Sequence, residues 1–404
     1  MALSDRPRRW PAIGHEQLVW DSRASSAAVS RADRQRAHGR YAAAVPAEIA
    51  ALDYVVPTDL AGPLEDAAAE LARYDAEMAT SPAPLDAVLL RSESAASSQI
   101  ENLTASARSI GLAELGDDSR GNARLVVANA HAMRCALDLA ADLTPATVLA
   151  LHRALLGDSE PDIAGAWRTE PVWIGRSALS PVGAEYVAPR AERIGPLVED
   201  LMAYARRVDQ PVLAQAALAH AQFETIHPFP DGNGRTGRAL LHAMLRHHRL
   251  SRHVTVPVSA GLLADVSGYH AALTAYRAGD PDPVVRLCVD ATFRAITNGR
   301  ALAAQLAEIR EGWRSAITAR RDSAVWQAAD LFLARPVLDA AQVAAALGIA
   351  VPNAHRHLER LVEAGVLTSF PLYRRARGWR ADAVLAALDA FAARAGRRAR
   401  AGGP

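Results

Sequence analysis

Most of this chain carries the residue spacing of helices, and this spacing constrains its fold more than any other feature. Apolar residues, many of them alanine, recur three and four positions apart along much of residues 45–320, which is the period of one helix face. We therefore expect a mainly α protein. Helices are predicted at about 85–100, 121–142, 144–156, 191–208, 210–226, 234–249, 266–278 and 282–316.

The N-terminal part of the chain is less regular. Residues 45–83 are predicted to form helices broken at Pro57, Pro63 and Pro82, because proline lacks the N–H group that continues a helix. Residues 1–45 are polar and rich in arginine, and we expect them to be loosely ordered at their start.

Composition narrows the classes of function. The formal net charge is +1 over 404 residues, so no overall field draws the protein to nucleic acid or to a membrane. No apolar run reaches the roughly 18 residues of a membrane span, and the N-terminus lacks the apolar segment of a signal peptide. With only two cysteines, the chain is predicted to be cytoplasmic. Lysine is absent, so a nucleotide would be bound by arginine, backbone and metal.

The most informative stretch is residues 227–238, His-Pro-Phe-Pro-Asp-Gly-Asn-Gly-Arg-Thr-Gly-Arg. The glycines beside Asn233 let the backbone turn tightly and present its N–H groups to an anion. Strong helix formers follow, so the anion would lie at a helix N-terminus, where the helix dipole favours negative charge. Arg235 and Arg238 are three apart and can both reach a phosphate. His227, just before the loop, is placed as a proton acceptor.

Each defining position of this stretch matches the signature of the Fic family, His-x-Phe-x-Asp/Glu-Gly-Asn-Gly-Arg-x-x-Arg, and the chain resembles that family over roughly residues 45–300. The resemblance implies a helical core with the motif in a loop between two helices. It also implies an enzyme that transfers the AMP part of ATP to a side-chain hydroxyl of a protein. ATP would be the substrate, Mg²⁺ the metal, and the target a protein with a hydroxyl acceptor, this protein itself included.

The resemblance also implies a role for each residue of the motif. His227 would deprotonate the acceptor hydroxyl, Asp231 would hold Mg²⁺ between the α- and β-phosphates, and Phe229 would anchor the loop in the core. The glycine-rich turn would form the anion hole, and the two arginines would bind the β/γ end of the nucleotide. The residues expected to bind ATP are Gly232, Asn233, Gly234, Arg235, Thr236 and Arg238.

Residues 172–187 contain two short β-like runs joined by a turn-forming segment, which predicts a hairpin. This hairpin resembles the flap of the family, which would pair with an extended segment of the target by strand addition. Val172, Ile174 and Tyr186 are the candidates to hold that segment. An ordinary structural hairpin is the alternative for each of them.

A second motif lies far upstream, in Ser97-Ser-Gln-Ile-Glu101-Asn102. It matches the inhibitory motif of the family, Ser/Thr-x-x-x-Glu-Gly/Asn, and Ser97 and Glu101 are four apart, on one helix face. The resemblance implies that Glu101 forms a salt bridge with Arg238 and blocks the ATP pose that transfer needs. The alternative is an ordinary helix end, at which Glu101 and Asn102 have no special role.

Residues 322–385 are predicted to form a separate unit. A capped helix at 339–348, a second helix at 352–365 and a hairpin at 366–379 give a helix-turn-helix with a wing. It resembles the winged helices often found after a Fic core. Residues 386–404 are expected to form a helix followed by a basic tail.

The C-terminal part is basic. Residues 320–404 contain 13 Arg against 7 Asp plus Glu, which gives +6 (13 − 7), and such charge favours contact with DNA phosphates. Winged helices also serve as protein-docking or dimerisation modules, so both partners stay open. The residues expected to contact DNA are Asn353, His355, Arg356 and Arg360 in the groove and Arg374, Arg375 and Arg377 on the wing.

Together these observations predict a cytoplasmic, autoinhibited protein adenylyltransferase. Two alternatives keep the fold: removal of AMP from a modified protein, and transfer of another group such as UMP or phosphocholine. An alternative of another class is a DNA-binding regulator with the Fic core as a sensor. The target and the oligomeric state, a homodimer included, stay open. The predicted domains are an N-terminal helical region at 1–110, a catalytic core at 111–300, a linker helix at 301–321, the winged helix at 322–385 and the tail at 386–404.

Overall fold

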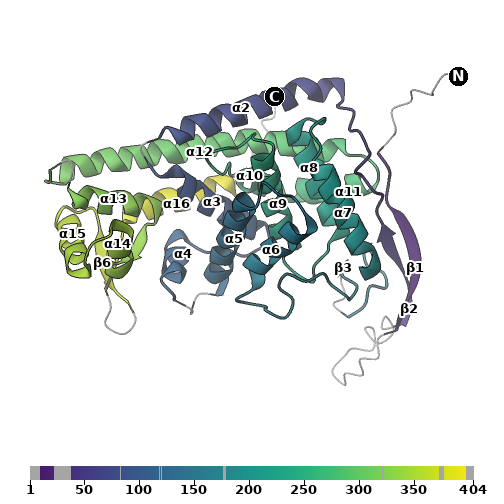
Figure 1. Ribbon diagram of the computed structural model, residues 1–404, viewed down its shortest axis with the longest axis horizontal. Coiled ribbons are helices and arrows are strands. Elements are labelled where there is room, and N and C mark those ends of the chain that lie inside the picture. Colours follow the sequence, from purple (N-terminus) through teal and green to yellow (C-terminus); the bar gives the residue numbers. More distant parts are fainter. Residues whose placement is uncertain are drawn as a thin grey trace. The chain divides into compact units, whose positions relative to one another are not determined.

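The computed structural model describes residues 10–21, 38–81, 83–117, 119, 121–175, 179–320, 323–372 and 377–396. Helices dominate this part of the chain and are accompanied by three small antiparallel sheets (Figure 1), which confirms the mainly α class. The chain divides into two compact units, each assembled from segments that are distant in sequence. The first unit comprises Met1–Glu65, Cys135–Arg249 and Ser267–Val289, and the second comprises Asp66–Arg134, Leu250–Val266 and Asp290–Pro404.

The first unit is built around helix α8 (Val212–Ile226), whose residues from Leu213 to Ile226 are all buried. Its sequence is rich in alanine and apolar on most sides, as expected for a helix surrounded by protein. It packs against both α7 and α9, and α6 packs against α9. The other elements that lie mainly in this unit are β1 (Gly14–Asp21), β2 (His38–Val45), α6 (Pro145–Leu156), β3 (Trp173–Ile174), β4 (Tyr186–Val187), η1 (Ala191–Arg193), α7 (Ile194–Ala205), α9 (Asn233–His247) and α11 (Val266–Arg277).

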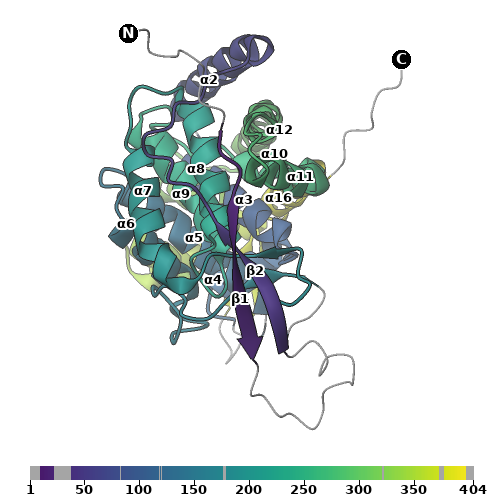
Figure 2. The same ribbon diagram turned by 90° about the vertical axis from the view of Figure 1, so that its right-hand side faces the viewer.

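Strands β1 and β2 form an antiparallel hairpin (Figure 2), which the prediction of a loosely ordered start missed. The register pairs Gly14 with Val45 and Asp21 with His38. Alternate residues face inward, but the polar residues between them masked the period of two in the sequence. One face packs on the short β3–β4 hairpin, whose existence the sequence did predict. The apolar side chains in this contact are Leu18, Trp20, Tyr41, Ala43, Trp173, Ala184 and Val187.

The second unit contains most of two long helices, α2 (Thr58–Ala79) and α12 (Asp282–Ala316), which begin in the first unit. Within the second unit they lie side by side, since Arg300 of α12 pairs with Glu70 at 2.5 Å and with Glu77 at 2.8 Å (Figure 1). The remaining elements are α3 (Leu85–Ile100), α4 (Ala107–Glu114), α5 (Gly121–Asp138), α10 (Val258–Leu262), η2 (Leu263–Asp265), α13 (Ala324–Ala334), β5 (Val337–Asp339), α14 (Ala340–Leu347), α15 (Val351–Glu363), β6 (Thr368–Pro371), β7 (Arg377–Arg380) and α16 (Asp382–Ala395).

The predicted break at Pro63 is wrong, because α2 begins directly after Pro57 and continues through Pro63. A proline inside a helix removes one backbone hydrogen bond. The loss is tolerated here because the buried face continues across it, with Leu60, Leu64 and Leu71 all nearly inaccessible to water. The predicted break at Pro82 lies outside the described residues.

The C-terminal segment has the order of elements predicted for a winged helix-turn-helix. Helices α14 and α15 are followed by β6 and β7, and β5 completes a sheet of order β5–β7–β6. Asp339 caps α14 by accepting the N–H of Gln342 at 2.7 Å, and Gly348 ends it in the left-handed conformation. The sequence prediction omitted α4, α13 and β5, and it began the last helix at 386 instead of Asp382. None of the described helices is both long and apolar enough to cross a membrane.

Candidate active site

The motif loop begins where α8 ends, at His227. The backbone of His227 is left-handed, with φ 49° and ψ 61°, a conformation that costs a non-glycine residue about 1 to 3 kcal/mol. This turn directs the chain out of the helix and leaves the imidazole 27% exposed. Nδ1 lies 3.9 Å from Oε2 of Glu224, which is almost buried one turn earlier in α8. The predicted base therefore has a partly accessible ring with a carboxylate beside one nitrogen.

Phe229 and Asn233 fix the shape of the loop. The Asn233 side chain accepts the N–H of Phe229 at 2.9 Å and donates to the carbonyl of Phe229 at 2.8 Å. These two hydrogen bonds close the turn from Phe229 to Asn233 in the way that a pair of main-chain hydrogen bonds would. Phe229 is fully buried, as the sequence predicted. Because the Asn233 amide is engaged at both ends, the group of this residue best placed to meet an anion is its backbone N–H.

His152 of α6 contacts the motif loop through a ring stack and a hydrogen bond, and the sequence analysis did not identify it. Its ring stacks on Phe229 with centroids 3.7 Å apart. Nδ1 accepts the N–H of Gly165 at 2.9 Å, so the other nitrogen, Nε2, carries the proton and donates to the carbonyl of Asp231 at 3.0 Å. Burial lowers the pKa of His152 below its ordinary value. A histidine 75 residues before the motif in an apolar helix carries no sequence signal that separates it from an ordinary core residue.

Helix α9 begins at the loop and carries both arginines of the motif. Gly232 takes φ 75° at the N-cap, where a β-carbon would also lie 3.0 Å from Leu155. Arg235 and Arg238 are 4% and 1% exposed. Nε and Nη1 of Arg235 are buried and have no hydrogen-bond partner among the described residues. Buried guanidinium donors without acceptors are costly, so this arrangement suits an anion that would supply them.

The remaining residues of the first helical turn differ in exposure. Gly234 is partly exposed, whereas Thr236 is fully buried and donates its N–H to the carbonyl of Gly232 at 3.0 Å. Gly237 lets α9 approach α8 closely, since a β-carbon there would lie 2.8 Å from the ring of Phe223. The sequence motif leaves this position unspecified, and only the packing shows its role.

Asp231 is the exposed carboxylate of the loop. Its side chain is 58% accessible, and Oδ2 lies 3.2 Å from Nη2 of Arg235. Among the described residues no group of three or more His, Cys, Asp and Glu side chains could hold a metal ion. An exposed carboxylate is a suitable ligand for Mg²⁺, which usually binds one or two carboxylates together with substrate phosphates, and the role of Asp231 as its ligand stays a prediction.

The β3–β4 hairpin is tied to the end of α8. The hydroxyl of Tyr186 donates to the carbonyl of Thr225, and the guanidinium of Arg277 lies 3.8 Å from the centre of the Tyr186 ring. Tyr186 thus anchors the hairpin beside the motif in this structure. Val172 is partly buried, and Ile174 is the most accessible of the three predicted target contacts, at 48%.

The predicted inhibitory motif ends helix α3 in the second unit. Ser97 is fully buried and Glu101 is the exposed C-cap residue. Asn102 has φ 62° and donates its N–H to Gln99, while the N–H of Leu103 reaches the carbonyl of Ser98, both at 3.0 Å. These bonds form a Schellman motif, which needs a glycine or asparagine in the left-handed position. Asn102 therefore has a structural reason for its identity, and the pairing of Glu101 with Arg238 stays a prediction.

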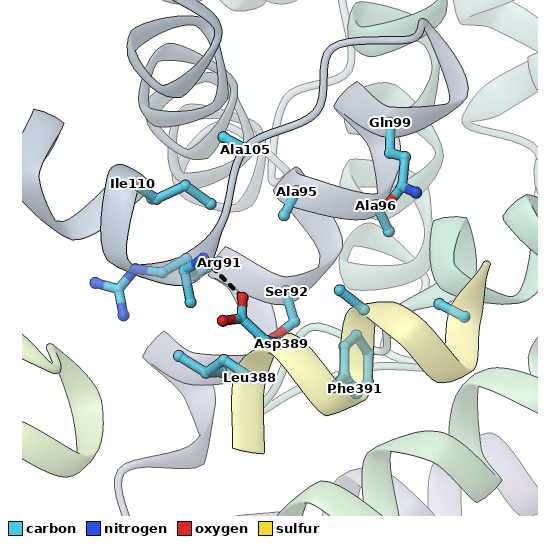
Figure 3. Close-up of a pocket in the computed structure, with 13 residues that line it drawn as sticks. Arg91, Ser92, Ala95, Ala96, Gln99, Ala105, Ile110, Leu388, Asp389 and Phe391 are labelled. Atoms are coloured by element: carbon cyan, nitrogen blue, oxygen red, sulfur yellow. Dashed lines mark hydrogen bonds between the residues drawn. The ribbon is translucent and has the colours of Figure 1, made fainter. Parts of the chain in front are cut away.

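The C-terminal helix α16 packs against both α3 and the start of α4. Asp389 of α16 accepts the N–H of Ala107 at 2.9 Å (Figure 3). Between α16, α3 and the start of α4 lies a small cavity of about 40 Å³, which Phe391 and Gln99 border. Its wall is built largely from small side chains, among them Ala95, Ala96, Ala105, Ala107, Ala392 and Ala395.

The structure describes five of the seven predicted DNA contacts, and Arg374 and Arg375 lie outside the described residues. His355, Arg356 and Arg360 are exposed on α15, and Asn353 is partly so. All three described arginines have partners within the unit: Arg360 donates to the carbonyl of Thr318 at 2.8 Å, Arg377 pairs with Glu359 at 2.6 Å, and Arg356 donates to Oδ1 of Asn353. These contacts would compete with phosphate, and DNA binding stays a prediction.

Comparison with known proteins agrees with the motif. Residues 142–245 match the Fic/DOC family. Protein adenylyltransferase fic-1 of Caenorhabditis briggsae is 34% identical over 139 residues, which cover 34% of this chain and 25% of that protein. Protein adenylyltransferase Fic of Drosophila willistoni is 31% identical over 155 residues, or 38% of this chain and 29% of that protein. The match thus spans about a quarter of the length of these relatives.

One solved structure extends the similarity of fold beyond the matched residues. A Fic family protein from Desulfovibrio desulfuricans G20 aligns with a TM-score of 0.51 and covers 81% of this chain and 97% of its own. The two sequences are 22% identical, so this likeness concerns the fold.

Proposed function

The chain carries a Fic/DOC domain at residues 142–245, and from this premise we propose that it transfers AMP from ATP to a hydroxyl of a protein side chain. The proposal rests on one observation: a partly exposed His227 lies beside a helix N-terminus at which Arg235 has buried donors with no acceptor among the described residues. The imidazole of His227 is suited to accept a proton, and the donors of Arg235 are suited to bind phosphate oxygens. Both lie within a loop that Asn233 and His152 hold in shape.

In the proposed reaction the imidazole of His227 accepts the proton of the target hydroxyl as its oxygen attacks the α-phosphorus of ATP. The bond from the α-phosphorus to the bridging oxygen breaks, and pyrophosphate leaves. The N–H groups at the start of α9 and the guanidinium groups of Arg235 and Arg238 would stabilise the charge on the phosphates. Little covalent chemistry is needed from the protein, because positioning and charge neutralisation dominate such transfers.

Asp231 would hold Mg²⁺ against the phosphates, where the ion neutralises negative charge. The high exposure of its carboxylate, 58%, leaves room for a hydrated ion. The protein's own contribution is to hold the main chain that carries this carboxylate, through the bond from His152 to the carbonyl of Asp231.

Labelled nucleotides test the proposal. The full chain is incubated with ATP labelled at the α-phosphate and, separately, at the γ-phosphate, and label on protein is measured. We expect α-label on the protein and no γ-label. His227→Ala should lower the rate at least ~10²-fold, as loss of a general base does. His247→Ala removes a histidine that bonds the carbonyl of Ala140 at the far end of α9 and serves as the matched control.

Each possible result of this experiment distinguishes the proposed reaction from one alternative. γ-Label on protein would indicate phosphoryl transfer, and α-label from UTP in preference to ATP would change the transferred group. Equal rates for the His227→Ala and His247→Ala variants would remove His227 from the mechanism. No label from any nucleotide, with wild type and with Glu101→Gly, would contradict transfer altogether.

A further inference from the structure

The carbonyl groups at the end of α8 need hydrogen-bond donors just where the motif begins. The last carbonyl groups of a helix have no partner within it, and here they precede a residue held in the left-handed conformation. The carbonyl oxygens of Thr225, Ile226, His227 and Pro228 all accept hydrogen bonds from residues just before or within the β3–β4 hairpin. Tyr186 bonds the first of them, and a single residue, Arg168, bonds the other three.

Arg168 bonds this backbone through three groups. Its own N–H donates to the carbonyl of Pro228 at 3.0 Å, and its Nε donates to the carbonyl of His227 at 2.8 Å. Nη2 reaches the carbonyl of Ile226 at 3.5 Å. The planar guanidinium therefore sets the direction of the peptide groups on both sides of the proposed base.

The same guanidinium holds the base of the hairpin. Nη1 donates to the carbonyl of Glu170 at 3.2 Å, before β3, and Nη2 donates to the carbonyl of Pro189 at 2.5 Å, after β4. Arg168 thus joins both legs of the hairpin to the residues around His227. Among the described residues, only Arg168 bonds the backbone at His227 and both legs of the hairpin.

Arg168 is an unusual buried cation. It is 3% exposed, and among the described residues its guanidinium bonds only to main-chain carbonyl groups. Burial lowers its pKa to about 10, which leaves it charged at neutral pH. A planar fork with five donors can satisfy several carbonyl groups at fixed angles, which a lysine cannot do. The geometry, and not only the charge, explains an arginine at this position.

We propose that Arg168 is a positioning residue that fixes His227 for proton transfer and couples its orientation to the hairpin on which the target would lie. The inference rests on the proposed transfer of AMP, but its effect on the loop is independent of that function. Substitution should therefore loosen the loop and slow the chemical step, while nucleotide affinity, which depends on α9, is largely kept.

Three variants test this in the full-length chain: Arg168→Met, Arg168→Lys and Arg207→Met. Arg207 also bonds two backbone carbonyls, of Ala50 at 3.2 Å and Leu52 at 2.6 Å, and is the matched control. Hydrogen exchange of the 223–233 peptide is measured without nucleotide. Transfer rate and affinity for Mg-ATP are then measured well below every melting temperature.

For Arg168→Met we expect faster exchange in 223–233 and a transfer rate lower by about 10²-fold, the usual effect of a misplacement near 1 Å. Affinity for Mg-ATP should change less than about threefold, and Arg168→Lys should be intermediate because it keeps fewer donors. Arg207→Met should melt earlier with little change in rate. If Arg168→Met does not fold, Arg168→Lys carries the test.

Two results would overturn the proposal: unchanged exchange in 223–233, or a rate for the Arg168 variants no lower than that of Arg207→Met. A weaker affinity for Mg-ATP that accounts for the whole loss of rate would also overturn it. If neither wild type nor Glu101→Gly transfers label while the exchange result is as expected, the proposed function fails and the role of Arg168 in holding the loop stands.

Discussion

Gly237→Ala should destabilise the protein, although alanine is the better helix former. Gly237 lies in the first turns of α9, where this helix crosses α8. A β-carbon at this position would lie 2.8 Å from Cδ1 of Phe223, 3.1 Å from Oε1 of Glu224 and 3.1 Å from Nδ1 of His220. Phe223 is fully buried, so its ring cannot move aside without moving its neighbours.

The size of the effect follows from two opposing terms. Alanine gains about 0.5 to 1 kcal/mol over glycine in a helix interior. An extra methyl group in a packed core costs about 1 to 3 kcal/mol. The difference between the two terms is a loss of about 0 to 2.5 kcal/mol, with its middle near 1 kcal/mol. Since Phe223 also contacts Phe229, with ring centres 6.3 Å apart, the displacement should reach the loop and lower transfer as well.

Gly312→Ala provides the matched control. Gly312 is exposed in α12, and a β-carbon there would meet no atom within 4 Å. This variant should gain up to about 1 kcal/mol and keep its activity. Urea unfolding and thermal melting of both variants and wild type measure the difference. The close packing of α8 and α9 would be refuted if Gly237→Ala were as stable as Gly312→Ala.

Two further changes test the site. Protonation of His152 would remove the acceptor for the N–H of Gly165, and burial lowers the pKa of this histidine. The melting temperature of the protein should therefore fall as the pH drops below about 6.5. The variant His152→Gln cannot titrate at this position and should lose that part of the pH dependence. Glu101→Gly should raise the rate of AMP transfer if Glu101 pairs with Arg238 and blocks the ATP pose. An unchanged rate would contradict the inhibitory role of Glu101. Loss of an AMP-releasing activity would favour the hydrolase alternative.

The motif and the helices around it could be predicted because their information is local. Residues 227–238 are contiguous, and α8 and α9 follow the expected ranges at 210–226 and 234–249 within a few residues. The turn at Gly232 follows from residue type, and the burial of Phe229 agrees with the role that the family resemblance implied. Local periodicity and a fixed spacing are sufficient for this part of the site.

The supports of the loop could not be predicted, because they come from distant residues. Arg168 lies 59 positions before the carbonyl that it bonds, and His152 lies 79 positions before Asp231. Neither belongs to a spaced pattern, and either would pass for a core residue. Asn102 is a different case. The sequence analysis assigned it to a functional motif, but its left-handed backbone at the end of α3 also explains why an asparagine occurs there.

The packing of α16 on α3 affects how the C-terminal segment can be studied. Truncating the chain before α13 would also remove α16, and the alanine side chains of α3 that lie beside Phe391 would then be exposed to water. A change in activity after such a deletion would then report the solvation of α3 as much as the loss of a DNA or protein partner. Substitutions at exposed positions of α15, such as Arg356→Ala, keep this contact intact. They are the sharper means of asking what the C-terminal segment binds.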